Sequence, residues 1–222
     1  MSADQEQPTI PLAERALRTL RGEILAGTRP PGSPLSEKSL ASELGMSRTP
    51  IRAALKTLQQ EGLAVVGGRR LLEVTPVTPE GRSEVVSLRV AIETVVVRRL
   101  CELRAEGEIE PDQLDGLRLL LLKQRRAAKE EDAARFFELD EELHLALASL
   151  SGLPNARRFL FELGGFVRLQ RIGLPASYEH MSEITREHEE LIEAIELADG
   201  DGAVALATRH MLSTAARSAV PT

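Results

Sequence analysis

Two short helix signals joined by a glycine turn are the feature that most constrains the fold of this chain. Ser36 offers an N-cap to the first segment, and Gly45 stops that segment, since a left-handed C-cap favours a residue without Cβ. Ser47 then opens the second segment, with Pro50 in its first turn, where a proline removes no needed amide donor. Apolar residues mark the buried side of that second segment: Ile51, Leu55, Leu58 and Leu63.

Further elements flank this pair of helices. An amphipathic helix is predicted over 12–26 and stops at a glycine followed by the Pro-Pro-Gly stretch at 30–32. Two β-like stretches, 63–66 and 71–75, enclose the turn 67–70 and predict a hairpin. A helix, a helix-turn-helix and then a hairpin is the order of a winged helix-turn-helix, which reads double-stranded DNA.

The N-terminal end of the second helix presents polar side chains suited to a DNA groove. Arg48 and Arg52 lie four residues apart and so share one face, and a guanidinium can grip guanine or phosphate with two bonds. The hydroxyls of Ser47 and Thr49 suit phosphate oxygens. The alternative is an ordinary helical hairpin with solvated arginines.

The wing and the composition refine this interpretation. Gly67 and Gly68 allow close approach of the backbone to a minor groove, with Arg69 and Arg70 in reach of its edges or of phosphates. Aromatic residues make up 3% of the chain and Trp is absent, so stacking on bases is not the main mode of recognition. Residues 1–78 carry a net charge of +2 and residues 79–222 carry −8, which indicates two modules with different partners.

The second module is predicted to be wholly helical. The Thr-Pro-Val-Thr-Pro stretch at 75–79 forms a restricted linker between a DNA-binding domain at 8–76 and a helical domain at 79–218. Apolar positions at helical spacing favour one antiparallel bundle of about six helices, so the fold class is mainly α. Glycine, proline and acidic breaks place these helices at 79–106, 111–130, 132–151, 154–172, 179–198 and 201–218.

Three histidines and one aspartate in this module have the spacing of a metal site. Asp140 and His144 lie four residues apart on a core-like helix face. His188 and His210 stand 12 residues before and 10 residues after the turn near Gly200, so antiparallel helices bring them to similar depths. Such a ligand set suits zinc foremost, or nickel, manganese or iron. The alternative is a structural Asp–His pair with separate core or surface histidines.

The N-terminal module resembles the GntR superfamily of bacterial transcription factors. The resemblance rests on the stretches Pro-Gly-Ser-Pro-Leu-Ser-Glu at 31–37, Ser-Arg-Thr-Pro-Ile-Arg-Ala-Ala-Leu at 47–55 and Leu-Gln-Gln-Glu-Gly-Leu at 58–63. It implies operator binding by a homodimer. The DNA contacts that it implies are Ser47, Arg48, Thr49 and Arg52, with Lys38 and Gly68 beside them. The wing departs from the family pattern, since its basic residues follow the glycines instead of preceding them.

The second module resembles the FCD ligand-binding domain, in its smaller VanR-type form, over about 80–217. The resemblance rests on Phe137-x-x-Asp140-x-x-x-His144, on Glu187-His188 and on His210. It implies that Asp140, His144, His188 and His210 hold a divalent metal ion whose open positions take an effector carboxylate. It also implies that Arg89, with Glu93 one turn later, clamps that carboxylate. A family asparagine is replaced by Leu153, which removes one polar contact.

These patterns predict a metabolite-responsive transcriptional regulator, a repressor in its expected mode, that binds a small organic acid and is not an enzyme. A metal-dependent hydrolase is a weaker hypothesis, because Glu141 is expected to face solvent and no other general base is evident. A regulator that binds fatty or aromatic acids without metal, and a purely structural bundle, are the remaining alternatives. The sequence shows no apolar run of membrane length and no secretory signal, and its single Cys101 allows no internal disulfide, so a cytoplasmic location is expected.

Overall fold

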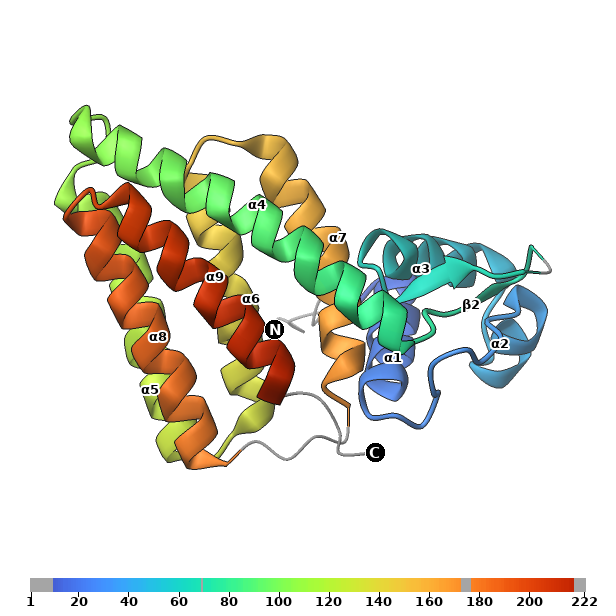
Figure 1. The fold of residues 1–222 in the computed structure, drawn as a ribbon. Helices are drawn as coiled ribbons and strands as arrows, with labels where there is room; N and C mark the ends of the chain where they lie inside the picture. Colours follow the sequence, from blue (N-terminus) through green and yellow to red (C-terminus); the bar gives the residue numbers. More distant parts are fainter. Residues whose placement is uncertain (1–9, 69, 173–176, 218–222) are drawn as a thin grey trace, which may run out of the picture. The chain divides into compact units, whose positions relative to one another are not determined.

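The computed structural model describes residues 10–68, 70–172 and 177–217, and it divides into two compact units between Val77 and Thr78. Figure 1 shows the short helices and small sheet of the first unit and the long helices of the second. In the part of the chain that the structure covers, no helix is long and apolar enough to cross a membrane.

The first unit is a three-helix core with a two-stranded wing. Strands β1 and β2 pair antiparallel, with Val65 opposite Glu73, and an isolated bridge ties Pro34 to Glu73. The elements of this unit are α1 (Leu12–Leu25), α2 (Glu37–Glu43), α3 (Arg48–Gln60), β1 (Ala64–Val66) and β2 (Leu72–Val74).

Local sequence signals place the helix-turn-helix. The Ser36 hydroxyl accepts a hydrogen bond from the Ser39 amide and caps α2. Gly45 adopts a φ of +62°, the left-handed conformation that glycine adopts without steric cost, and so reverses the chain between α2 and α3. Fully buried side chains from all three helices, among them Leu20, Leu40 and Ile51, close the core beneath them.

The second unit is an antiparallel helical bundle, so the mainly helical fold class with a winged first unit is confirmed. Thr78 caps its first long helix, and Pro79 occupies the first helical turn. The elements are α4 (Pro79–Ala105), the 3₁₀ turn η1 (Pro111–Leu114), α5 (Asp115–Lys129), α6 (Ala133–Leu150), α7 (Pro154–Gln170), α8 (Tyr178–Glu196) and α9 (Gly200–Arg217).

The packing of the bundle decides which helices meet at its centre. Helix α4 packs along α9, α5 packs along α6, and α8 packs against both α5 and α9 (Figure 1). A tight turn with Ala198 at a φ of +56° reverses the chain from α8 into α9. Helix α7 lies against α4 and α6. The core is apolar except for a group of polar side chains on α4, α5, α6, α8 and α9.

Candidate metal centre and nucleic-acid interface

Four buried side chains from three helices meet inside the bundle. Asp140 and His144 extend from α6, His188 from α8 and His210 from α9, and each is no more than 4% exposed. One potential ligand atom from each lies within 4.8 Å of the other three. The structure therefore brings together the four residues that the sequence predicts as ligands.

The outer nitrogens of two imidazoles have acceptor partners. His188 Nδ1 lies 3.1 Å from Gln124 Oε1 on α5, and His210 Nδ1 lies 2.6 Å from Glu187 Oε2 on α8. Because both partners are acceptors, each Nδ1 carries the proton and donates it. The Nε2 atoms of the neutral rings therefore present lone pairs toward the centre.

The third imidazole and the aspartate complete the centre. Glu93 Oε2 on α4 lies 2.7 Å from His144 Nδ1. Asp140 Oδ2 accepts a hydrogen bond of 3.0 Å from Arg171, while Oδ1 has no hydrogen-bond partner among the described residues. That free oxygen lies 3.6 Å from His188 Nε2 and 4.0 Å from His144 Nε2.

Burial and charge set the protonation states in this cluster. Burial lowers the pKa of His188 well below its usual value, and His210 reinforces this effect against Asp140. Burial also lowers the pKa of His210, although Glu187 opposes it. Burial raises the pKa of Asp140, but Arg171 and the imidazoles outweigh it and hold that pKa far below its ordinary range. His188 and His210 are therefore favoured as neutral imidazoles beside the ionised carboxylate of Asp140.

This arrangement fits a divalent metal ion. His188 Nε2 and His210 Nε2 lie only 3.1 Å apart, and two lone pairs at that distance repel unless a proton or a cation lies between them. Their lowered pKa values disfavour the proton. Three imidazoles and one carboxylate oxygen, with acceptors behind at least two of the rings, form a ligand set typical of zinc and related metals.

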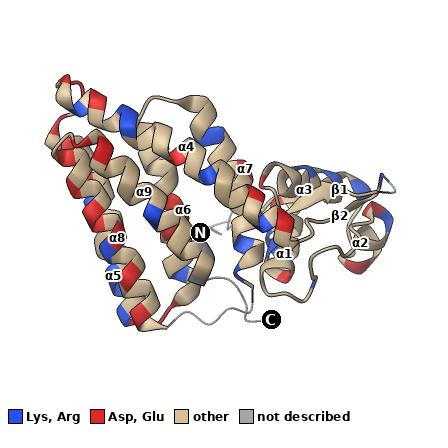
Figure 2. Cartoon of the chain, viewed as in Figure 1, with Lys and Arg blue, Asp and Glu red and all other residues tan. Residues whose placement is uncertain are grey.

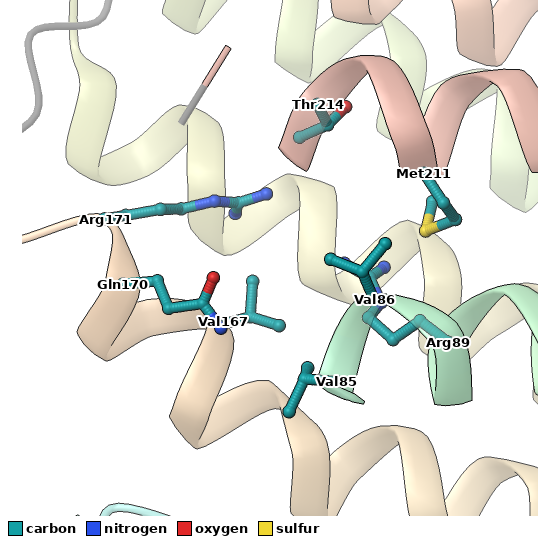
Figure 3. Close-up of a pocket in the computed structure, with 8 residues that line it drawn as sticks. All are labelled: Val85, Val86, Arg89, Val167, Gln170, Arg171, Met211 and Thr214. Carbon is teal, nitrogen blue, oxygen red and sulfur yellow. The ribbon is translucent and has the colours of Figure 1, made fainter. Parts of the chain in front are cut away.

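Two small hollows lie beside the cluster and share Arg89, Val167 and Arg171 in their lining. One hollow, of about 20 Å³, reaches Asp140 and His144, and the other, of about 30 Å³, is the one drawn in Figure 3. The predicted effector clamp Arg89 thus lies next to the predicted ligands. Its Nε donates to Glu93 Oε1 at 2.8 Å, and the two hollows are large enough for water-sized groups.

The expectation that Glu141 faces solvent is wrong. Its side chain is 18% exposed, lines the smaller hollow, and pairs through both oxygens with Arg168 on α7 at 2.5 and 2.6 Å. Helix α7 permits this approach because Gly164 has no side chain, and a Cβ there would lie 2.5 Å from Glu141 Oε1. Pairing with an arginine engages the carboxylate that the hydrolase hypothesis would need as a base.

Sequence reasoning missed two partners of the imidazoles, Gln124 and Glu187. Gln124 is fully buried and follows Leu117, Leu120 and Leu121 on the apolar side of α5. An amide at a position where helical periodicity calls for an apolar residue is the signal that could have identified it. Glu187 directly precedes a predicted ligand, and on a helix its direction cannot be read without the neighbouring α9.

The predicted DNA contacts lie at the solvent-facing end of α3. Ser47, Arg48 and Thr49 are exposed at its start, as are Lys38 on α2 and Gly68 in the wing. Arg52 is also exposed, but its guanidinium pairs with the Glu37 carboxylate through two bonds of 2.9 Å. Arg69 lies outside the described residues. Figure 2 shows Lys and Arg segments along α3.

A groove of about 620 Å³ runs between α2, α3 and the wing. Its lining includes Lys38, Arg48 and Arg52 together with two further cations, Lys56 and Arg70, while Glu37 opposes them. Lys56 was missed as a candidate, although it follows Arg48 and Arg52 at the same four-residue spacing. The groove therefore carries an excess of positive charge, as nucleic-acid contact requires.

Comparison with known families agrees with this architecture. Residues 12–74 match the family model "Bacterial regulatory proteins, gntR family", and residues 84–213 match the FCD domain model. The fold and the groove define a winged-helix DNA-binding regulator with a helical second domain. The chain belongs to the GntR family of transcriptional regulators and carries an FCD domain.

Relatives extend over most of the chain. The HTH-type transcriptional repressor RspR of Escherichia coli is 30% identical over 93% of this chain and 89% of its own length. The gluconate operon transcriptional repressor of Bacillus subtilis is 30% identical over 83% of this chain and 76% of its own. Among solved structures, E. coli McbR/YncC superposes with a TM-score of 0.74 at 23% identity, covering 94% of this chain and 97% of that one, which shows a shared fold.

Proposed function

We propose that this protein is a metal-dependent transcriptional repressor that responds to a small organic acid. Asp140, His144, His188 and His210 hold one divalent cation, zinc foremost. A small carboxylate-containing metabolite binds beside it. The supporting observation is the pair of Nε2 atoms of His188 and His210, which lie 3.1 Å apart on rings whose Nδ1 atoms face acceptors. Beside them lies Asp140 Oδ1, which has no hydrogen-bond partner within the described part of the chain. When bound, the metal supplies a Lewis-acidic position for the oxygen of the acid.

The acid site rests on Arg89 and its surroundings. Its side chain is 13% exposed, and it lines both hollows next to the cluster. A buried guanidinium is stable only when it is paired, and Glu93 supplies that charge from one turn along α4. The remaining N–H donors of Arg89 suit a carboxylate, with two parallel bonds available to it.

The groove of the first unit binds the operator. Arg48 and Arg52 contact base edges or phosphates in a major groove, Ser47, Thr49 and Lys38 contact phosphates, and the wing at Gly68 approaches the neighbouring backbone. One such module recognises only a half-site, so two copies bind a two-fold symmetric operator as a homodimer. Binding of the acid shifts the population of the states that bind this operator.

The metal centre is tested by elemental analysis of protein that has been stripped with a chelator and then dialysed against zinc. We expect about one zinc per chain in the wild type and in His180→Ala, the matched histidine outside the cluster. His144→Ala should retain almost none at unchanged helicity by circular dichroism. Equal zinc in all three proteins would contradict the metal centre.

Operator binding is tested by gel shift with the DNA upstream of the protein's own gene. Site-selective retardation that weakens with salt is expected, and acids that bind the sensor should change it. A normal response to acid in zinc-free protein would favour the regulator that senses acids without metal. Absence of selective retardation under all these conditions would contradict the proposed function.

A further inference from the structure

We infer that Arg171 is a second anchor for the effector's carboxylate and that it is shared between this acid and Asp140. This inference rests on the proposed metal and acid site. It adds a specificity-determining residue on α7 that neither the sequence motifs nor the comparisons assign.

Arg171 is held in place from two sides. It is the C-cap residue of α7, and its guanidinium lies 4.3 Å from the centre of the Phe137 ring on α6. One turn further along α6, Asp140 accepts its single hydrogen bond within the described residues, from Nη2 to Oδ2 at 3.0 Å. The side chain is 10% exposed. Stacking on an aromatic ring and one charge contact therefore position a nearly buried cation.

The free donors of Arg171 face the place where an acid would bind. A guanidinium has five N–H donors, and one of them is engaged by Asp140. Figure 3 shows Arg171 extending from the end of α7 over the same hollow that Arg89 borders from α4. Arg171 also lines the hollow beside Asp140 and His144. Two guanidiniums from different helices thus border one space next to the ligand cluster.

The size of the hollows determines how an acid enters. Both hollows are partly open to solvent and hold about 20 and 30 Å³, enough for a water-sized group, so a carboxylate enters more fully when a side chain moves. Arg89 donates through Nε to a carboxylate on its own helix, and Arg168 engages both oxygens of Glu141. Arg171 contacts Asp140 through Nη2 alone, whereas Arg89 contacts Glu93 through both Nε and Nη2, so the contact of Arg171 is the one that an incoming carboxylate displaces most easily.

The exchange links the acid to the metal ligand. Oδ1 of Asp140 faces the imidazoles, and Oδ2 accepts a hydrogen bond from Arg171. The same carboxylate therefore balances the charge of both the guanidinium and the proposed metal ion. When an organic acid replaces Asp140 as the partner of Arg171, the negative charge of Asp140 is no longer shared with the guanidinium and acts on the ligand cluster alone. Acid and metal therefore strengthen each other's binding, and the coupling is reciprocal.

The test measures acid affinity at saturating zinc by isothermal titration, with sodium acetate and sodium malonate as probes. Arg171→Met should weaken acid binding by about 10–100-fold, the loss expected for hydrogen bonds to a charged group. Arg171→Lys should lose less. The matched control Arg158→Met, an exposed arginine on α7 that is paired with Glu162, should stay near the wild type.

The outcomes separate a binding role from a structural one. If Arg171 only orients Asp140, Arg171→Met weakens zinc binding but leaves acid affinity at saturating zinc unchanged, and the inference is overturned. An equal loss in Arg158→Met, or failure of both acids to bind zinc-loaded wild type, overturns it as well. Absence of zinc uptake by the wild type would instead contradict the proposed metal centre. Circular dichroism and zinc content confirm that each variant is folded and loaded.

Discussion

The cations of the winged unit that are predicted to contact DNA, Lys38, Arg48 and Arg52, are exposed, whereas the polar groups of the bundle centre are almost completely buried. The Arg52 side chain is 71% exposed while it contacts Glu37, but His188 is fully buried between Gln124 and His210. Exposed ion pairs contribute little to folding, and burial of polar groups opposes it. The first arrangement is therefore open to a partner in solution, and the second is closed off inside the bundle.

The largest expected effect concerns the exposed arginines of the winged unit. Replacing both Arg48 and Arg52 with alanine should weaken operator binding by at least about 30-fold, since each lost bidentate base contact costs ~1–3 kcal/mol. The slope of affinity against salt should also become shallower. Fluorescence anisotropy at several salt concentrations measures both. Arg126→Ala, an equally exposed arginine paired with Glu130 in the bundle, is the control and should leave binding unchanged.

The next effect concerns the buried side. Gln124→Leu removes the acceptor behind His188 and should weaken zinc binding by about 10–100-fold, as loss of an outer partner does. The same change leaves the buried Nδ1–H of His188 without its acceptor, so zinc-free protein should become less stable by about 1 kcal/mol. Competition with a zinc indicator and urea unfolding measure the two quantities. A loss of stability without any loss of zinc affinity would show that Gln124 only packs.

A smaller effect is expected when the pH of the zinc-free protein is lowered. The folded pKa of His188 and of His210 lies below the usual 6.5, so below that pH the unfolded chain takes up protons that the folded chain refuses. Stability should therefore be fully present above about pH 6.5 and decrease as the pH falls below it. Melting temperatures between pH 8 and pH 5 test this trend. In His188→Gln the decrease of stability with falling pH should be shallower than in the wild type. A profile identical to that of the wild type would show that other groups cause the decrease.

The smallest expected effect concerns the Glu37–Arg52 pair. Glu37→Ala frees the Arg52 guanidinium while it leaves the helix cap at Ser36 in place, so the melting temperature should change little. Operator binding should strengthen a few-fold, because no internal carboxylate then competes for Arg52. Glu43→Ala, a neighbouring surface acid paired with Arg29, is the matched control. Weaker operator binding in Glu37→Ala would mean that the pair pre-positions Arg52 for DNA.

The sequence predicts those features that depend on local spacing. Gly45, Ser36 and the i, i+4 arginines are read along one chain segment, and the helix-turn-helix forms there. The convergence of Asp140, His144, His188 and His210 follows from helix periodicity and one turn, and the structure brings them together, while their role as ligands stays a prediction. The contacts of Gln124, Glu141 and Arg171 depend on which helices become neighbours, and no local pattern specifies that.

The bidentate contact between Arg52 and Glu37 means that the winged unit contains its own anionic competitor. A carboxylate already occupies donors that a phosphate or a guanine edge would need, so DNA must exchange with it on arrival. A DNA acceptor therefore replaces an existing contact of Arg52 and does not add a new one. The net gain in free energy from that arginine is smaller than it would be for an unpaired cation. In this way one acidic side chain sets a threshold for Arg52, which a DNA acceptor that takes two bonds meets more readily than one that takes a single bond.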